Sequence, residues 1–125
     1  MGSAYLASGN AISERAKLYP IGYKRMMNTI LRTDVFDRWL SRLKDPRAKA
    51  RIIKRIRSAE RGNLGDCKPV GAGVSEMRIH FGPGYRVYFM RIGDVIYLLL
   101  CGGTKRGQSS DIAKAKELAR LFKET

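Results

Sequence analysis

Five side chains that bind phosphate or transfer protons stand at alternate positions on both sides of one Gly-Pro-Gly turn. Alternate residues of a β-strand point to the same side of a sheet, so a hairpin across residues 82–84 would gather all five on one face. The set combines a carboxylate and an imidazole, which exchange protons, with a phenol and two guanidiniums, which bind phosphate oxygens. It suits a phosphodiester better than a packed core. The five residues are Glu76, Arg78, His80, Arg86 and Tyr88.

The turn also predicts which residues face each other across the hairpin. A tight turn fixes the register, and side chains at paired positions contact each other on each face. The expected pairs are His80 with Arg86 and Arg78 with Tyr88 on the polar face, and Phe81 with Tyr85, Ile79 with Val87 and Met77 with Phe89 on the apolar face.

The charge of the chain favours a polyanionic partner. Its 125 residues include 25 Lys and Arg against 11 Asp and Glu, giving a formal net charge of +14 and a pI of about 10.3. Such a balance is typical of nucleic-acid-binding proteins. A basic surface that only maintains solubility is the simpler alternative. A role at a membrane surface is weaker, because the sequence has no lipidation motif.

Length and composition predict one domain, residues 27–125, preceded by an N-terminal arm or extension, residues 1–26. The first 26 residues have no clear hydrophobic face and no apolar core of a signal peptide. The longest apolar run, residues 95–101, is far shorter than the roughly 20 residues that cross a bilayer. Cys67 and Cys101 lack metal-ligand spacing, so we interpret them as packing residues of a reduced, cytoplasmic protein. No metal or cofactor is expected.

The hydrophobic spacing predicts a strand, two helices, three strands and a final helix. The first strand covers residues 28–32. Thr33 or Asp34 caps the first helix, and Asp45-Pro46 opens the second, which Gly62 ends. The remaining strands cover residues 67–70, the two arms of the hairpin and residues 95–100. Residues 101–106 are predicted as a flexible basic turn before a helix capped near Asp111.

The second helix carries a run of cations on the side away from its apolar stripe. A run of this kind is more often a solvated face than a specific site, although it could equally engage RNA phosphates or an acidic partner. The residues are Arg47, Arg51, Lys54, Arg55 and Arg57.

Together these elements predict an α+β fold, a twisted antiparallel sheet with the two N-terminal helices on one face and a C-terminal helix. The apolar side of the hairpin would pack on the helices, and the polar side would remain open to a ligand. Lys105 and Arg106 would stand at the rim of that open side.

The chain resembles the RelE/ParE superfamily of bacterial toxins, and within it the HigB-like addiction-module killer proteins. The resemblance runs from about Ile30 to Leu121, and its order and spacing are more specific than any single piece. The matching pieces are Thr33-Asp34-Val35-Phe36, Trp39-Leu40, Leu43-Lys44-Asp45, Gly62-Asn63-Leu64-Gly65-Asp66, Lys68-Pro69-Val70-Gly71, Gly73-Val74-Ser75-Glu76-Met77-Arg78-Ile79, Gly82-Pro83-Gly84-Tyr85-Arg86-Val87-Tyr88-Phe89, Leu98-Leu99-Leu100, Gly102-Gly103, Lys105, Gln108 and Asp111-Ile112.

The resemblance implies a RelE-like fold and a ribosome-dependent endoribonuclease that cuts mRNA without a metal. It also implies a cognate, HigA-like antitoxin, which would carry a DNA-binding domain. Arg86 matches the family's arginine after the turn, and Arg78 matches a basic position before it, so both are assigned to the scissile phosphate. Glu76 stands where some relatives have a lysine.

The proton-transfer roles stay open at this point. Glu76 or His80 would act as general base, with the other, or Lys105, as acid. Glu76 could instead form an ion pair with Arg78 or Arg86, and His80 could be an ordinary surface residue. The expected RNA contacts are Tyr88, through stacking or else packing only, together with Arg106, Arg55 and Lys54.

Two alternatives remain. ParE-type toxins share the fold and inhibit gyrase without cutting RNA, so fold does not decide between the two activities. A non-catalytic RNA-binding module would also account for the charge. The clustered polar face of the hairpin favours the nuclease.

Overall fold

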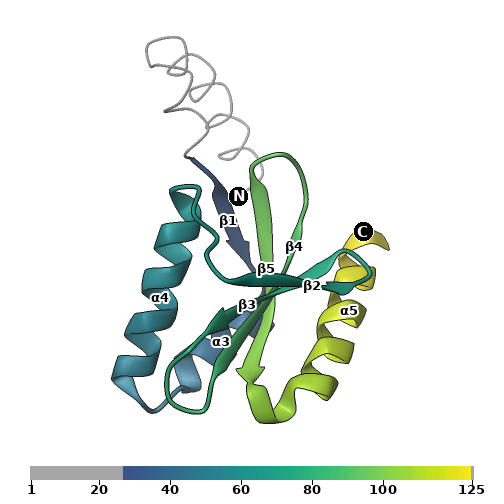
Figure 1. Cartoon of the computed structure of the whole chain (residues 1–125). Coiled ribbons are helices and arrows are strands. Elements are labelled where there is room, and N and C mark those ends of the chain that lie inside the picture. Colours follow the sequence, from purple (N-terminus) through teal and green to yellow (C-terminus); the bar gives the residue numbers. More distant parts are fainter. Residues whose placement is uncertain (1–26, 125) are drawn as a thin grey trace, which may run out of the picture.

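The computed structural model describes residues 27–124, and the predicted arm at residues 1–26 lies outside them. The described chain forms one sheet with helices on both of its faces (Figure 1). In chain order the elements are β1 (Thr29–Arg32), α3 (Asp34–Arg42), α4 (Pro46–Glu60), β2 (Cys67–Gly71), β3 (Val74–Ile79), β4 (Tyr85–Arg91), β5 (Ile96–Thr104), the 3-10 turn η1 (Lys105–Gly107) and α5 (Gln108–Glu124).

The fold is α+β, as the sequence predicts, and the sheet has the strand order β1-β5-β4-β3-β2. Strands β2 to β5 are antiparallel neighbours, whereas β1 runs parallel to β5. The sheet is therefore mixed, and the prediction of a purely antiparallel sheet is wrong at this edge. No tight turn joins β1 to its neighbour β5, because the two helices and β2 to β4 lie between them in the chain, so the pair is free to run parallel. The apolar strand β5 is internal, as its composition predicts, and β4 is the middle strand.

Both N-terminal helices begin at the caps that the sequence predicts. The Thr33 hydroxyl accepts a hydrogen bond from the Phe36 amide at 3.0 Å and donates one to the carbonyl of Leu100 at 2.6 Å. The Asp45 carboxylate accepts from the Arg47 amide at 2.9 Å, with Pro46 at the first helical position. The Thr33 contact ties the start of α3 directly to β5.

The main core lies between the sheet and the helices α3 and α4. It contains Met77, Ile79, Val87 and Phe89 from the hairpin, which confirms the predicted apolar face. Phe81 packs at its margin. Gly102 faces the same side, where an added Cβ would lie only 2.3 Å from the indole of Trp39. A glycine is required there so that α3 can approach β5 closely.

A second core covers part of the opposite face, which the sequence analysis expected to be open. Tyr88, Leu98 and Leu100 pack there against Ala115 and Ala119 of α5. The prediction of a free face is thus wrong where α5 covers it, because the small alanines let the helix lie directly on the strands. The part of this face next to the hairpin turn remains uncovered (Figure 1).

The segment predicted as a flexible basic turn is largely strand. Strand β5 continues to Thr104, and its last glycines make room for neighbouring side chains. An added Cβ at Gly103 would lie 1.9 Å from the Asp111 carboxylate. Gly102 and Gly103 thus allow neighbouring side chains to pack closely on the two faces of β5. Only η1 remains of the predicted basic turn.

Candidate functional site

The hairpin register differs from the predicted one by two residues. Arg78 pairs with Arg86, and Ile79 pairs with Tyr85, across a loop that spans residues 80–84. The loop has its own hydrogen bond from the Gly84 amide to the Phe81 carbonyl at 3.0 Å, with positive φ at Gly84. A shift of two residues preserves the alternation of faces. Arg78 and Arg86 therefore share the predicted polar face, and they face each other directly.

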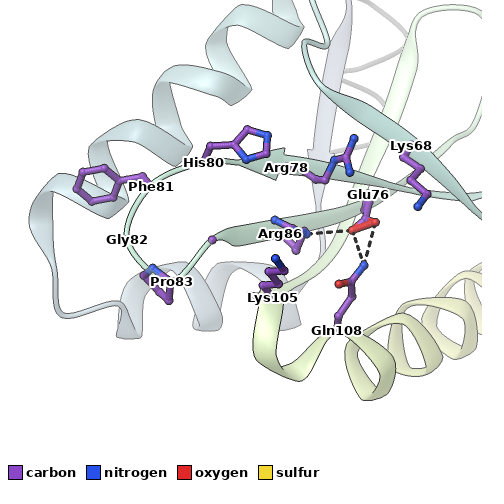
Figure 2. Close-up of a pocket in the computed structure, with 11 residues that line it drawn as sticks. Lys68, Glu76, Arg78, His80, Phe81, Gly82, Pro83, Arg86, Lys105 and Gln108 are labelled. Atoms are coloured by element: carbon purple, nitrogen blue, oxygen red, sulfur yellow. Dashed lines mark hydrogen bonds and ion pairs between the residues drawn. The ribbon is translucent and has the colours of Figure 1, made fainter.

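A cleft of about 600 Å³ lies on this face beside the turn. Figure 2 shows its lining residues, which come from β2, β3, the hairpin loop at residues 80–84, β4, η1 and the start of α5. Four of the lining residues are Lys or Arg, so the cleft has a basic wall that would attract a phosphate. The charged and amide side chains that line it are Lys68, Glu76, Arg78, His80, Arg86, Lys105 and Gln108.

Glu76 forms a buried ion pair at the floor of the cleft. Its side chain is 1% exposed, and its Oε2 lies 3.1 Å from Nε of Arg86. Gln108 Nε2 donates to both carboxylate oxygens, at 3.1 and 3.2 Å (Figure 2). Of the alternatives that the sequence left open for Glu76, the structure shows the ion pair with Arg86. A carboxylate buried this deeply and bound on both oxygens is poorly placed to take a proton from a substrate.

The Asp66 carboxylate links Arg78 and His80, two side chains that line the cleft. Its Oδ1 accepts from Nη2 of Arg78 at 2.8 Å, and its Oδ2 lies 2.6 Å from Nε2 of His80. The hydrogen bond with His80, followed by that with Arg78, holds the pKa of Asp66 below its usual range. His80 is itself 69% exposed, so its ring can reach a bound molecule. The imidazole is thus held by a carboxylate on one nitrogen and open on its other side.

Sequence reasoning missed the roles of Asp66 and Gln108. Asp66 ends the Gly62-Asn63-Leu64-Gly65 turn before β2, and the backbone bond from the Arg78 amide to the Asp66 carbonyl, at 2.9 Å, brings it beside β3. Gln108 lies 32 residues from its partner Glu76. Neither contact has a periodic signal in the sequence, because both depend on how distant segments meet.

Two lysines complete the basic wall. Lys105 is exposed at the start of η1, and its amide donates to the Gly84 carbonyl at 2.7 Å, which fixes η1 beside the hairpin turn. Lys68, which the sequence analysis did not select, is exposed on the edge strand β2 at the position paired with Glu76. Lys105 therefore lines the cleft together with Arg86 (Figure 2).

The predicted RNA contact of Tyr88 is wrong, and Arg55 is engaged inside the fold. Tyr88 is 0% exposed within the second core, so its ring cannot stack on a base. Burial, and next the nearby charge of Glu76, raises the pKa of its hydroxyl well above the usual value. Arg55 donates to the carbonyls of Arg78 and Leu64, the latter at 3.0 Å, and so joins α4 to the sheet; its contact with RNA stays a prediction.

The other two predicted contacts, Lys54 and Arg106, are exposed and stay predictions. Both stand outside the cleft lining, Lys54 on α4 and Arg106 in η1. Within residues 27–124, no three His, Cys, Asp or Glu side chains gather where they could hold a metal ion. None of the helices in the same range has both the length and the apolarity that crossing a membrane requires.

The chain belongs to the same family as a protein of Haemophilus influenzae described as an uncharacterized protein. The two are 51% identical over 88 residues, which are 70% of this chain and 89% of the relative. No family model matches the chain.

Proposed function

We propose that this member of the family is the toxin of a type II toxin-antitoxin system, a metal-independent endoribonuclease that cuts mRNA on the ribosome. One observation carries the proposal. A histidine held by a carboxylate stands beside a cleft whose wall supplies four Lys or Arg side chains. Cutting RNA without a metal needs this combination of a proton-transfer group and fixed cations.

The reaction follows from the chemistry of RNA. The 2′-oxygen attacks the adjacent phosphorus while the bond from phosphorus to the 5′-oxygen breaks. A base takes the proton of the 2′-hydroxyl, and an acid gives a proton to the leaving 5′-oxygen. The products are a 2′,3′-cyclic phosphate and a 5′-hydroxyl. Negative charge builds on the phosphate oxygens during the reaction, where cations stabilise it.

His80 is the better candidate for the general base. Asp66 bonds to its Nε2 and so favours the tautomer that keeps a proton there and a lone pair on Nδ1. Glu76, the other candidate, is buried and paired. Lys105 is exposed at the opposite side of the cleft and is the candidate acid, while Arg78 and Arg86 bind the phosphate between them.

An antitoxin is the expected protein partner. The exposed face of α4 carries Arg47, Arg51, Lys54 and Arg57, and such a surface favours an acidic segment or a nucleic acid. We expect a HigA-like antitoxin that bears a DNA-binding domain, so that the complex represses its own operon. The toxin alone should bind DNA weakly and with strong salt dependence.

Cleavage of a 5′-labelled mRNA by purified protein with translating ribosomes tests the proposal. We expect cleavage to need no divalent ion beyond the Mg²⁺ that keeps the ribosome assembled, and to stop when a single 2′-deoxynucleotide replaces the nucleotide at the cut. Cleavage that requires a divalent ion beyond the needs of the ribosome, or that tolerates the 2′-deoxy substitution, would reject this mechanism.

The pairing of Arg86 with Glu76 favours one second candidate, a module that binds RNA without cutting it. A guanidinium already neutralised by a buried carboxylate stabilises less new charge than a free one. Such a module would retain ribosome or RNA binding in the same assay and leave the mRNA intact.

A further inference from the structure

We infer that Gln108 is a positioning residue, which orients the guanidinium of Arg86 through the carboxylate of Glu76. The inference rests on the proposed function, since it assigns Arg86 to the phosphate. Gln108 itself would not touch the reacting atoms.

The carboxylate of Glu76 is the centre of this arrangement. Gln108 Nε2 lies 3.1 and 3.2 Å from its two oxygens, and Arg86 Nε lies 3.1 Å from one of them. Glu76 is 1% exposed and Arg86 only 7%, so water does not substitute readily for these partners. Figure 2 shows Arg86 and Gln108 both directed at the Glu76 carboxylate, each from a different side. Gln108 therefore fixes the rotation of the carboxylate that Arg86 meets.

Arg86 needs such an anchor because of the residue across from it. Arg78 occupies the paired position on β3, and like charges at paired positions repel each other. The Glu76 carboxylate attracts the guanidinium at its Nε, 3.1 Å away, as an ion pair without hydrogen-bond geometry. Nη1 donates to the carbonyl of Tyr85 at 3.4 Å. Nη1 lies next to Gly84, where an added Cβ would be 3.7 Å away. Arg86 thus lines the cleft although its side chain is largely buried.

The anchor is rigid because Gln108 is the first residue of α5. That helix is fixed on the sheet by Ala115 and Ala119, both essentially buried. Lys105, three residues before Gln108, is tied by its amide to the Gly84 carbonyl at 2.7 Å. One short segment therefore sets the positions of both Lys105 and, through Glu76, Arg86.

Two variants of Gln108 test the inference, with Ser109→Ala, an exposed neighbour at the start of α5, as a matched control. Gln108→Met keeps the length and removes the donor. We expect kcat to fall by on the order of 10- to 100-fold with little change in KM, the usual cost of a misplaced catalytic group. In NMR spectra, the Nε–H signal of Arg86 should exchange with solvent faster in this variant than in the wild type or in the control.

Gln108→Glu adds a pH signature that a purely structural role would not produce. Its carboxyl group can donate to Glu76 when protonated, like the amide that it replaces, and repels Glu76 when ionised. The ratio of variant to wild-type kcat should therefore rise as the pH falls from 8 toward 5, whereas the ratio for Gln108→Met should stay flat.

Unchanged exchange of the Arg86 Nε–H in Gln108→Met, together with a flat ratio for Gln108→Glu, would overturn the inference. If the wild type cuts no RNA, the proposed function fails. The Arg86 exchange measurement then still decides whether Gln108 orients the guanidinium.

Discussion

Arg78 on β3 and Arg86 on β4 lie at directly paired positions of the hairpin, and each is held by its own carboxylate. Asp66 binds Arg78 at 2.8 Å, and Glu76 binds Arg86 at 3.1 Å. The two anions oppose the repulsion between the guanidiniums and hold both on one face. A phosphate that enters the cleft would meet two cations whose positions are already fixed, which lowers the cost of ordering them during a reaction.

Arg86→Lys tests whether Arg86 binds the phosphate, and it does so without leaving the buried carboxylate of Glu76 unpaired. Lysine keeps a positive charge for the ion pair but cannot present the planar fork of a guanidinium. We expect the ribosome-dependent kcat to fall about 100- to 1,000-fold, the usual cost of losing a preorganised donor, in a protein that stays folded. Full cleavage by this variant would remove Arg86 from the site.

Arg86→Ala should instead destabilise the fold, because it leaves the buried carboxylate of Glu76 without its cation. Breaking such a pair costs about 3–5 kcal/mol in the free energy of unfolding. Adding Glu76→Gln should recover part of this loss, since the amide carries no charge. Urea unfolding of the single and the double variant measures both effects, and equal stabilities would contradict the account.

The carboxyl group of Asp66 should titrate below the ordinary pKa of about 3.9. Its folded-state pKa is lowered, chiefly by the hydrogen bond with His80 and then by Arg78. The contacts of Asp66 with His80 and Arg78 therefore stabilise the folded protein at a pH above the pKa that Asp66 has in the unfolded chain. This stabilisation is lost as the pH falls through the lower pKa that Asp66 has in the folded protein. An NMR titration should show the pKa rising toward normal in His80→Ala, and less so in Arg78→Ala.

Tyr88→Phe should leave cleavage and RNA affinity unchanged. The phenol oxygen is buried and makes no hydrogen bond with the described residues, so its removal leaves no hydrogen-bond partner unsatisfied. The free energy of unfolding should stay equal or rise by about 1 kcal/mol, because an unsatisfied polar group leaves the core. A large loss of RNA binding, measured by filter retention, would restore Tyr88 as a ligand contact.

Lys54→Ala and Arg106→Ala test the two exposed cations that remain as RNA contacts. Each true phosphate contact contributes about 0.7 to the slope of log affinity against log salt for single-stranded RNA. We expect each variant to reduce the slope by about that amount while kcat on bound ribosomes stays the same. Lys114→Ala, an exposed lysine of α5, is the control. An unchanged slope would assign these cations to another partner or to solvent.

The sequence predicts which residues lie on the polar face of the hairpin better than it predicts how those residues pair. Successive side chains of a strand point to alternate faces of the sheet. An error of two residues in the predicted register therefore still places Arg78 and Arg86 on the same face. The pairing itself depends on the loop around Gly84, whose length is not visible in the spacing of the strands. The partners Asp66 and Gln108, and the burial of Tyr88 under α5, depend on contacts between distant segments. Local periodicity carries no information on such contacts.

Mapping the 5′ ends of cellular transcripts after brief induction of the chain tests the central claim most directly, with Arg86→Lys as the inactive control. The account predicts new 5′-hydroxyl ends inside translated regions and in phase with codons, absent in the control. Intact transcripts together with stalled replication, and inhibition of supercoiling by purified gyrase, would contradict it and favour the ParE-like activity.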